Sequence, residues 1–387
     1  MVLLGIDRIN EPDTAALLSG GRLGVISAAS GLASCMRFPI DILNEKFRVS
    51  AIFSPEHGPR GVAGPGERVP GGVDRATGLP VFSLFEDFIS LDDSQAPISG
   101  SALSGIDRFV FEMQDVGSRY FTYVSTLFCV MRECGKRGVP LTVLDRPNPI
   151  GGVVEGCLPD QKNLSFIGMT EVPIRHGMTV GELARFYNGE YGLGCDLSVI
   201  ELRGWRRDTY YDETGLPFVR PSPNLPTFES ILLYNGTCML AGTNVSEGRG
   251  TTLPFSMIGA EFIDPDALCR ELSRCDLYGV AFSPAYFRPD FSKSAGKVLY
   301  GVQIHVTDKR ALQPVRLGVT LIRTLQRMYP DDFSFNEPAP GGRYHIDLST
   351  GNSDLRLSSD GADAIMQRWN TDAGAFAART EKYRLYE

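Results

Sequence analysis

The sequence predicts an α/β protein whose first part contains a parallel sheet. Short apolar runs rich in β-branched and aromatic residues recur along the chain, and stretches of helical character lie between them. The runs are apolar throughout, which is typical of parallel strands covered by helices on both faces. The length of 387 residues indicates two domains. We therefore predict a Rossmann-like domain over residues 1–160 and a second, mixed α/β domain over residues 161–387.

Five strands and two helices are predicted in the first domain. The first helix has Pro39 in its first turn, and the second ends at Gly138, a residue suited to a helix stop. No Gly-x-Gly-x-x-Gly pattern follows the first strand, so a dinucleotide site is not predicted. The predicted strands cover 23–27, 49–53, 81–84, 108–113 and 141–144, and the predicted helices cover 39–46 and 121–138.

The second domain begins with a clear helix signal. Thr179 with Glu182 three residues later forms a capping-box pattern, which predicts a helix over 179–188. The three prolines of 221–226 exclude a helix or an inner strand there and predict a rigid loop around Asn224. Further helices are predicted over 266–274, 315–328 and about 362–383, and strands over 197–202 and 298–306.

Composition excludes several classes of function. The net charge of -8 argues against nucleic acid as a partner, and no apolar stretch approaches the ~20 residues that span a bilayer. Residues 1–8 lack the apolar segment of a secretory signal, so we expect a cytoplasmic protein. Eight scattered cysteines without Cys-x-x-Cys and four separated histidines predict neither disulfides nor a metal site, and no cofactor is expected. The oligomeric state is left open.

Polar side chains gather in loops that follow the predicted strands. Glu56 and His57 follow the second strand, Asp115 the fourth, and Arg146 the fifth. The carboxyl ends of parallel strands share one edge of a sheet, where open α/β folds bind ligands. Carboxylates, amides and arginines without a nucleophile elbow or P-loop suit a polyhydroxylated, anionic ligand. Each of these residues also has a structural explanation, such as a turn cap or an ion pair.

Eight motifs lie in order along most of the chain, at 54–61, 77–81, 114–119, 122–126, 145–149, 175–179, 221–226 and 246–251. They resemble those of the NamZ-type exo-β-N-acetylmuramidases. These are glycoside hydrolases first described as a domain of unknown function, DUF1343. The resemblance implies a Rossmann-like domain and a second α/β domain with a cleft between them. It also implies release of terminal N-acetylmuramic acid from the non-reducing end of peptidoglycan fragments.

Two features depart from that family. The turn after the first strand is Ser-Ala-Ala-Ser-Gly at 27–31, where the family usually has a Thr-Asn-x-Thr-Gly-like turn. An amide that would contact the sugar is therefore absent. Family members are also often exported, whereas the sequence predicts a cytoplasmic protein.

Glu56 is predicted as the principal catalytic acid, because a buried carboxyl can keep its proton near neutral pH. Asp115 is the candidate second carboxylate, which would activate water or orient the 2-acetamido group if that group is the internal nucleophile. A separation of ~5 Å between the two carboxyls favours a covalent intermediate, and ~6.5–9.5 Å favours direct attack by water. Glu247 is an alternative for either role, and His57 and His176 would orient these acids.

The substrate-binding candidates are cations for the lactyl carboxylate and amides for the hydroxyl and acetamido groups. Two other functions stay open: a non-catalytic protein that binds cell-wall sugars, and a hydrolase of another bond, such as a phosphoester, that would need a metal. The binding candidates are Arg60, Arg119, Arg146, Asn148, Arg175, Asn224, Asn244 and Arg249.

Overall fold

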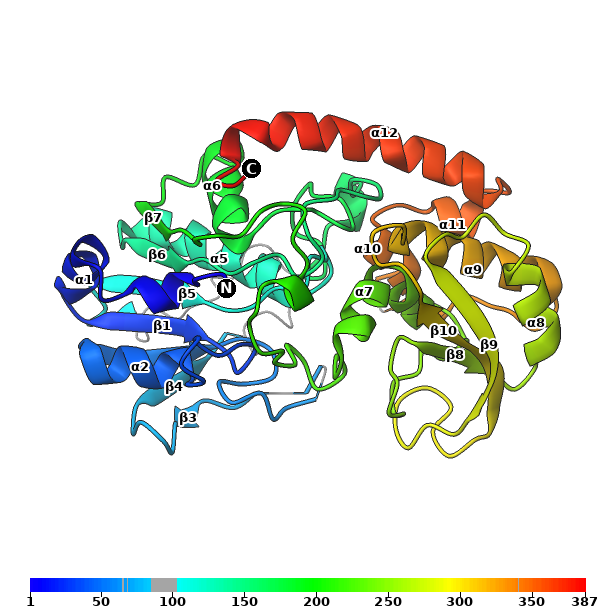
Figure 1. The fold of residues 1–387 in the computed structure, drawn as a ribbon, viewed down its shortest axis with the longest axis horizontal. Coiled ribbons are helices and arrows are strands. Elements are labelled where there is room, and N and C mark those ends of the chain that lie inside the picture. The colour runs from blue at the N-terminus through cyan, green and yellow to red at the C-terminus, as the bar shows by residue number, and fades with distance from the viewer. Residues whose placement is uncertain (65, 68, 85–102, 340) are drawn as a thin grey trace.

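The computed structural model describes residues 1–64, 66–67, 69–84, 103–339 and 341–387, and it contains two sheets (Figure 1). The larger sheet has the strand order β3-β4-β2-β1-β5-β6-β7, and the smaller has the order β8-β10-β9. The larger sheet is made of β1 (Leu23–Ser27), β2 (Val49–Ser54), β3 (Gly72–Val73), β4 (Pro80–Ser83), β5 (Arg108–Glu112), β6 (Leu141–Leu144) and β7 (Leu197–Ile200).

All neighbouring strands of the larger sheet pair in parallel except β3 and β4, which are antiparallel. Without β3, the strand order is that of a Rossmann fold, and it reverses between β1 and β5. The predicted α/β class and parallel sheet are therefore confirmed. The order also places the loops after β1, β2 and β5 next to one another, at the edge where such folds bind ligands.

Alternate residues of the apolar strands point to opposite faces of this sheet, and each face has its own core. Val25 and Val110 pack with the helix α2 (Pro39–Lys46), whereas Ile26 and Phe111 pack with α5 (Thr122–Arg137). α5 ends at Gly138, whose φ of 66° is left-handed, as the predicted stop requires. Both faces are thus covered, which is why the strands contain so few polar residues.

The first structural unit extends past the predicted boundary at residue 160. β7 pairs with β6, and α6 (Val180–Glu190), which begins at the predicted Thr179–Glu182 capping box, packs against the same sheet. The chain enters the second unit only at α7 (Phe228–Thr237), which lies between the two sheets in Figure 1. The strand predicted over 197–202 is correct, but it belongs to the first unit.

The second unit packs helices against one small antiparallel sheet. Its strands are β8 (Met257–Ala260), β9 (Val280–Phe287) and β10 (Leu299–Val306). Its helices are α8 (Pro265–Leu272), α9 (Pro314–Met328), α10 (His345–Thr350), α11 (Asp354–Leu357) and α12 (Ala362–Thr380). The remaining helical elements are α1 (Pro12–Ser19), η1 (Gly5–Arg8), η2 (Gln161–Asn163), η3 (Tyr211–Glu213), η4 (Cys238–Gly242) and η5 (Glu381–Tyr383).

The long helix α12 runs from the second unit back over the first, as Figure 1 shows. Phe376 of α12 lies 5.4 Å from Phe186 of α6, measured between ring centroids. After the helix, the hydroxyl of Tyr386 donates to Asp145 at the end of β6 over 2.6 Å. The C-terminal residues therefore close on the first sheet and join the two units. None of the described helices is long and apolar enough to span a membrane.

Candidate functional site

A pocket of about 650 Å³ lies between the carboxyl edge of the first sheet and the second unit. Glu56 and His57, from the loop after β2, line it on one side. Arg249 and His345 line it from the second unit, and Asn224 lines it from the proline-rich loop. Residues far apart in the sequence therefore meet in one cavity.

Two hydrogen bonds orient the carboxylate of Glu56. Its Oε2 accepts from the hydroxyl of Thr122 over 2.6 Å, and its Oε1 accepts from the backbone N–H of Gly66 over 3.0 Å. Thr122 is the first residue of α5, so the helix start fixes the position of the carboxylate. Of the described residues that line the pocket, Glu56 alone has a carboxylate.

His57 is buried beside Glu56 in an unusual backbone conformation. Its φ is 73° and that of Gly58 is 78°, and together they turn the chain sharply away from β2. A left-handed conformation is costly for a residue other than glycine and is found where surrounding structure holds it, often at functional sites. The Nδ1 of His57 lies 3.0 Å from the carbonyl oxygen of Ala63 and donates to it, because a carbonyl can only accept.

Arg249 provides the positive charge of the pocket. Its Nη1 donates to Oε1 of Glu247 over 2.7 Å, and its guanidinium lies 5.1 Å from the centroid of the Phe255 ring. Burial raises the pKa of Glu247, but Lys293 and Arg249 outweigh burial and leave that pKa below its ordinary value. Glu247 is therefore ionised and holds Arg249, while only Arg249 reaches the pocket.

Asn224 offers an unused amide to the pocket. Its side chain is buried, and its Nδ2 has no hydrogen-bond partner in the described protein. The backbone N–H of Asn224 donates to the hydroxyl of Ser222 over 3.4 Å, so the loop itself restrains the residue. A buried donor without a partner is costly, and a bound acceptor would satisfy it.

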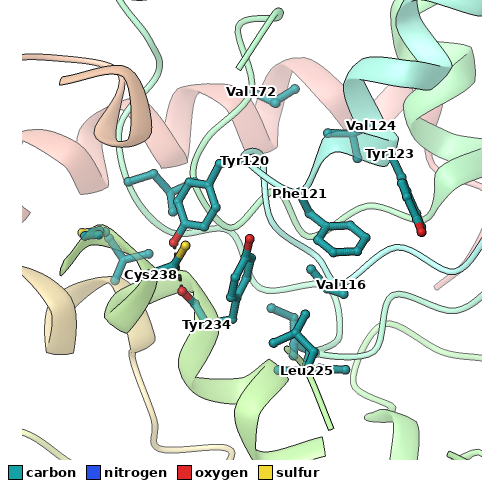
Figure 2. Close-up of a cluster of buried hydrophobic side chains, with 14 of the residues drawn as sticks. Val116, Tyr120, Phe121, Tyr123, Val124, Val172, Leu225, Tyr234 and Cys238 are labelled. Carbon is teal, nitrogen blue, oxygen red and sulfur yellow. Dashed lines mark hydrogen bonds between the residues drawn. The ribbon is translucent and has the colours of Figure 1, made fainter. Parts of the chain in front are cut away.

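Aromatic side chains form the apolar wall of the pocket. Figure 2 shows the rings of Tyr120, Phe121 and Tyr234 close together, with Cys238 beside Tyr120. The hydroxyl of Tyr120 donates to the carbonyl oxygen of Asn235 over 2.5 Å, which ties α7 to the start of α5. An apolar wall with a few polar groups is the usual composition of a ligand pocket.

His345, the first residue of α10, also lines the pocket. Its Nδ1 lies 3.2 Å from the hydroxyl oxygen of Ser349. Burial lowers the pKa of His345, and the positive charges of Arg249 and Lys293 lower it further, so the imidazole is neutral at neutral pH. His345 follows no predicted strand and belongs to none of the eight motifs, so it is not among the site residues predicted from the sequence.

Asp115 and His176 contact each other but do not line the pocket, which corrects the expectation that both contribute to it. The Nδ1 of His176 accepts from the N–H of Met178, so its Nε2 carries the proton and donates to Oδ2 of Asp115 over 3.1 Å. The same oxygen accepts from the N–H of Gly117 over 2.6 Å. The pair is buried and stabilises the turn after β5.

Arg146 and Asn148, which follow β6, are also buried outside the pocket. Arg146 pairs with Glu112 over 2.5 Å. The amide of Asn148 donates to the carbonyl of Met178 and accepts from the N–H of Ile150. Both side chains are buried and hydrogen-bonded within the first unit, and neither lines the pocket.

Arg119 and Arg175 donate to backbone carbonyls in the interior rather than to the pocket. Arg119 donates to the carbonyls of Cys157 and Val172 in the first unit and of Ser349 in the second. Arg175 donates to the carbonyl of Ile150 over 2.5 Å. These arginines join loops, and Arg119 joins the two units.

Two other predicted binding residues lie outside this pocket. The amide of Asn244 is used on both sides, donating to the carbonyl of Asp332 and accepting from the N–H of Ser334. Arg60 pairs with Asp41 and Asp74 and lines a separate cavity of about 570 Å³. Neither residue is within the set that surrounds Glu56.

The turn at 27–31 supports the sheet edge. The hydroxyl of Ser30 accepts from the N–H of Gln114 over 3.0 Å, and Gly31 lies against the guanidinium of Arg146. A Cβ at Gly31 would lie 2.4 Å from Nη1 of Arg146, so a larger residue would displace the arginine.

Within the described chain, no group of three or more His, Cys, Asp or Glu side chains is arranged to hold a metal ion.

Models of one protein family match nearly the whole chain. The N-terminal model of the exo-β-N-acetylmuramidase NamZ matches residues 23–229, and the C-terminal model matches residues 232–386. The two matches meet at the start of α7, where the chain passes between the structural units.

A curated relative and two solved structures are similar over the whole of this chain and over most of their own length. The peptidoglycan β-N-acetylmuramidase NamZ of Bacillus subtilis strain 168 is 38% identical, over 100% of this chain and 91% of the relative. Two crystal structures of DUF1343 family proteins from Bacteroides fragilis each cover 100% of this chain and 99% of their own. Their TM-scores are 0.89 and 0.79, and their sequence identities are 32% and 29%.

Proposed function

This chain belongs to the NamZ family of exo-β-N-acetylmuramidases, and we infer that it is a glycoside hydrolase that releases terminal N-acetylmuramic acid from the non-reducing end of peptidoglycan fragments. The residues that line the pocket indicate which side chains perform this reaction. One carboxylate, Glu56, lies on the first unit, and one cation, Arg249, lies on the second.

Glu56 is proposed as the general acid. The glycosidic oxygen must be protonated as it leaves, and a positioned carboxyl group does this in most glycosidases. The hydroxyl of Thr122 and the N–H of Gly66 fix the orientation of the carboxyl group toward one side of the pocket. His57, beside it, is proposed to orient the substrate or the acid.

Arg249 is proposed to bind the lactyl carboxylate of muramic acid. A guanidinium is always charged and pairs well with a carboxylate, and Glu247 keeps this one in place. The unused amide N–H of Asn224 is proposed to donate to the acetamido oxygen or to a ring hydroxyl. The aromatic wall would cover the apolar face of the sugar ring.

The absence of Asp115 from the pocket bears on the mechanism. A mechanism with two carboxylates needs both groups to flank the scissile bond, and only Glu56 does so among the described lining residues. This supports the alternative in which the 2-acetamido group of the substrate acts as the internal nucleophile. In that route Glu56 protonates the leaving oxygen and then deprotonates the water that opens the intermediate.

Product analysis on a defined disaccharide tests the proposed function. With N-acetylmuramic acid β-linked to N-acetylglucosamine, we expect both free sugars to form, at a rate unchanged by a metal chelator. Binding without any product would favour a non-catalytic sugar-binding protein. Loss of a phosphoesterase activity on chelation, with no release of sugar, would favour the metal-dependent alternative.

A further inference from the structure

Lys293 is a half-buried cation that the proposed mechanism does not yet use. It lies in the loop between β9 and β10, and its neighbours Ser292 and Ser294 have left-handed φ values of 71° and 57°. Such conformations persist outside glycine only where contacts hold the chain in place. The loop around Lys293 is therefore held in place by contacts outside its own turn.

All three ammonium protons of Lys293 are donated to backbone carbonyls. It donates to the carbonyl oxygens of Leu240, Thr243 and Val245 over 2.7, 2.8 and 2.7 Å. An ammonium has only three protons. Oε2 of Glu247 lies 3.1 Å from the same nitrogen, yet no hydrogen bond reaches this oxygen in the described protein. Glu247 is therefore balanced there by the charge of Lys293 rather than by a donated proton.

The charges of this cluster decide what the pocket presents to a ligand. Glu247 and Arg249 together are neutral, so that pair alone would attract an anion only weakly. Lys293 adds one positive charge beside Glu247, whose carboxylate is buried, so water screens this pair less than it screens a pair at the surface. The three side chains thus carry a net charge of +1, and Arg249 is the member that lines the pocket.

We propose that Lys293 is a positioning residue for substrate recognition: it offsets the charge of Glu247, so that Arg249 is held in place and still binds the lactyl carboxylate of the substrate. This rests on the proposed function of the pocket. A neutral hydrogen-bond donor would anchor the loop to the same carbonyls, whereas only a cation leaves Arg249 with an uncompensated charge.

The test compares a chromogenic N-acetylmuramide with its lactyl methyl ester, which has no negative charge. In Lys293→Met we expect KM for the muramide to rise about tenfold, with kcat changed less than about twofold and KM for the ester unchanged. The matched control is Lys297→Met, in the same loop, where an exposed lysine pairs with Glu261. This control should match the wild type on both substrates.

A second variant distinguishes the effect of the charge of Lys293 from the effect of its hydrogen bonds that anchor the loop. Lys293→Met with Glu247→Gln removes one charge of each sign, so the cluster returns to +1. We expect the preference for the charged muramide to return in this double variant, even if Lys293→Met alone folds poorly. Equal losses on muramide and ester, or no recovery in the double variant, would overturn the proposal and make Lys293 a loop anchor only. If the wild type hydrolyses neither substrate, the proposed function itself fails.

Discussion

Glu56 and Asp115 each follow a strand of the same parallel sheet, yet only the carboxylate of Glu56 reaches the pocket. The difference is local. After Glu56 the chain turns through His57 and Gly58, both with positive φ, and this leaves the carboxylate at the sheet edge. Asp115 instead bonds the N–H of Gly117 two residues ahead, as aspartate often does in turns, and pairs with His176.

Asp115→Asn tests this division of roles. An asparagine can keep one acceptor for Gly117 and His176, but it loses the charge-assisted bonds and places an amide nitrogen where Oδ1 already has no partner. We expect the free energy of unfolding to fall by about 1–3 kcal/mol. In the same variant kcat should stay within about threefold of the wild type, because general-acid groups contribute much more than that. Denaturant titration and steady-state kinetics give both values. A large loss of kcat with unchanged stability would return Asp115 to the reaction.

At the scale of elements, the shape of the pocket depends on the position of α7. Two glycines allow α7 to pack closely against α9 and so determine that position. Gly236 of α7 and Gly318 of α9 face each other at the point where the two helices cross. A Cβ at Gly236 would lie 2.0 Å from the backbone oxygen of Pro314, so only glycine permits this approach. Tyr234, on the same helix, lines the pocket, and the crossing therefore sets the position of that wall.

Gly236→Ala is expected to lower the free energy of unfolding by about 1–3 kcal/mol, because the new methyl group meets backbone that cannot move aside. Gly374→Ala is the matched control. Gly374 lies in α12, and a Cβ there has no atom within 4 Å. Alanine should therefore stabilise that helix by about 1 kcal/mol. Chemical denaturation measures the change in the free energy of unfolding for both variants. Equal changes would contradict the close contact between α7 and α9 at Gly236.

Some elements could be predicted from the sequence, and others could not. The buried strands of the first sheet are apolar throughout, so the sequence predicts both their positions along the chain and the α/β fold class. α7 was missed although Thr227 caps it by accepting from the N–H of Ser230. The helix is buried from Ser230 to Thr237, so it has no polar face to reveal its period. β9 was missed for a different reason, since most of its residues are exposed or only partly buried.

At the scale of the whole molecule, tertiary contacts decided which polar residues form the site. The sequence indicated Glu56, His57, Asn224 and Arg249, because loops after buried strands and rigid proline turns carry them. It also indicated Arg119, whose Nη1 and Nη2 donate to carbonyls in both units once the chain is folded. His345 could not be found, since α10 reaches the pocket only through the packing of the second unit.

Contacts between the two units fix the positions of the two sides of the pocket relative to each other. Arg119 contacts both units, and α12 with the residues after it returns to the first sheet at Tyr386. Glu56 comes from one unit and Arg249 from the other, so the pocket exists only while these contacts hold. We propose that this shared pocket performs the hydrolysis through Glu56.

The most direct measurement is the turnover of the muramyl–glucosaminyl disaccharide by Glu56→Gln, with Glu67→Gln as the control. Glu67 lies in the same loop region and accepts the N–H of Gly64 over 2.8 Å, but it does not line the pocket. We predict that Glu56→Gln lowers kcat at least about a hundredfold, since an amide cannot act as the general acid. The melting temperature should not change, because the amide oxygen can accept from the N–H of Gly66 and the amide N–H can donate to the hydroxyl of Thr122. Glu67→Gln should retain the wild-type rate. Full turnover by a well-folded Glu56→Gln would contradict the account.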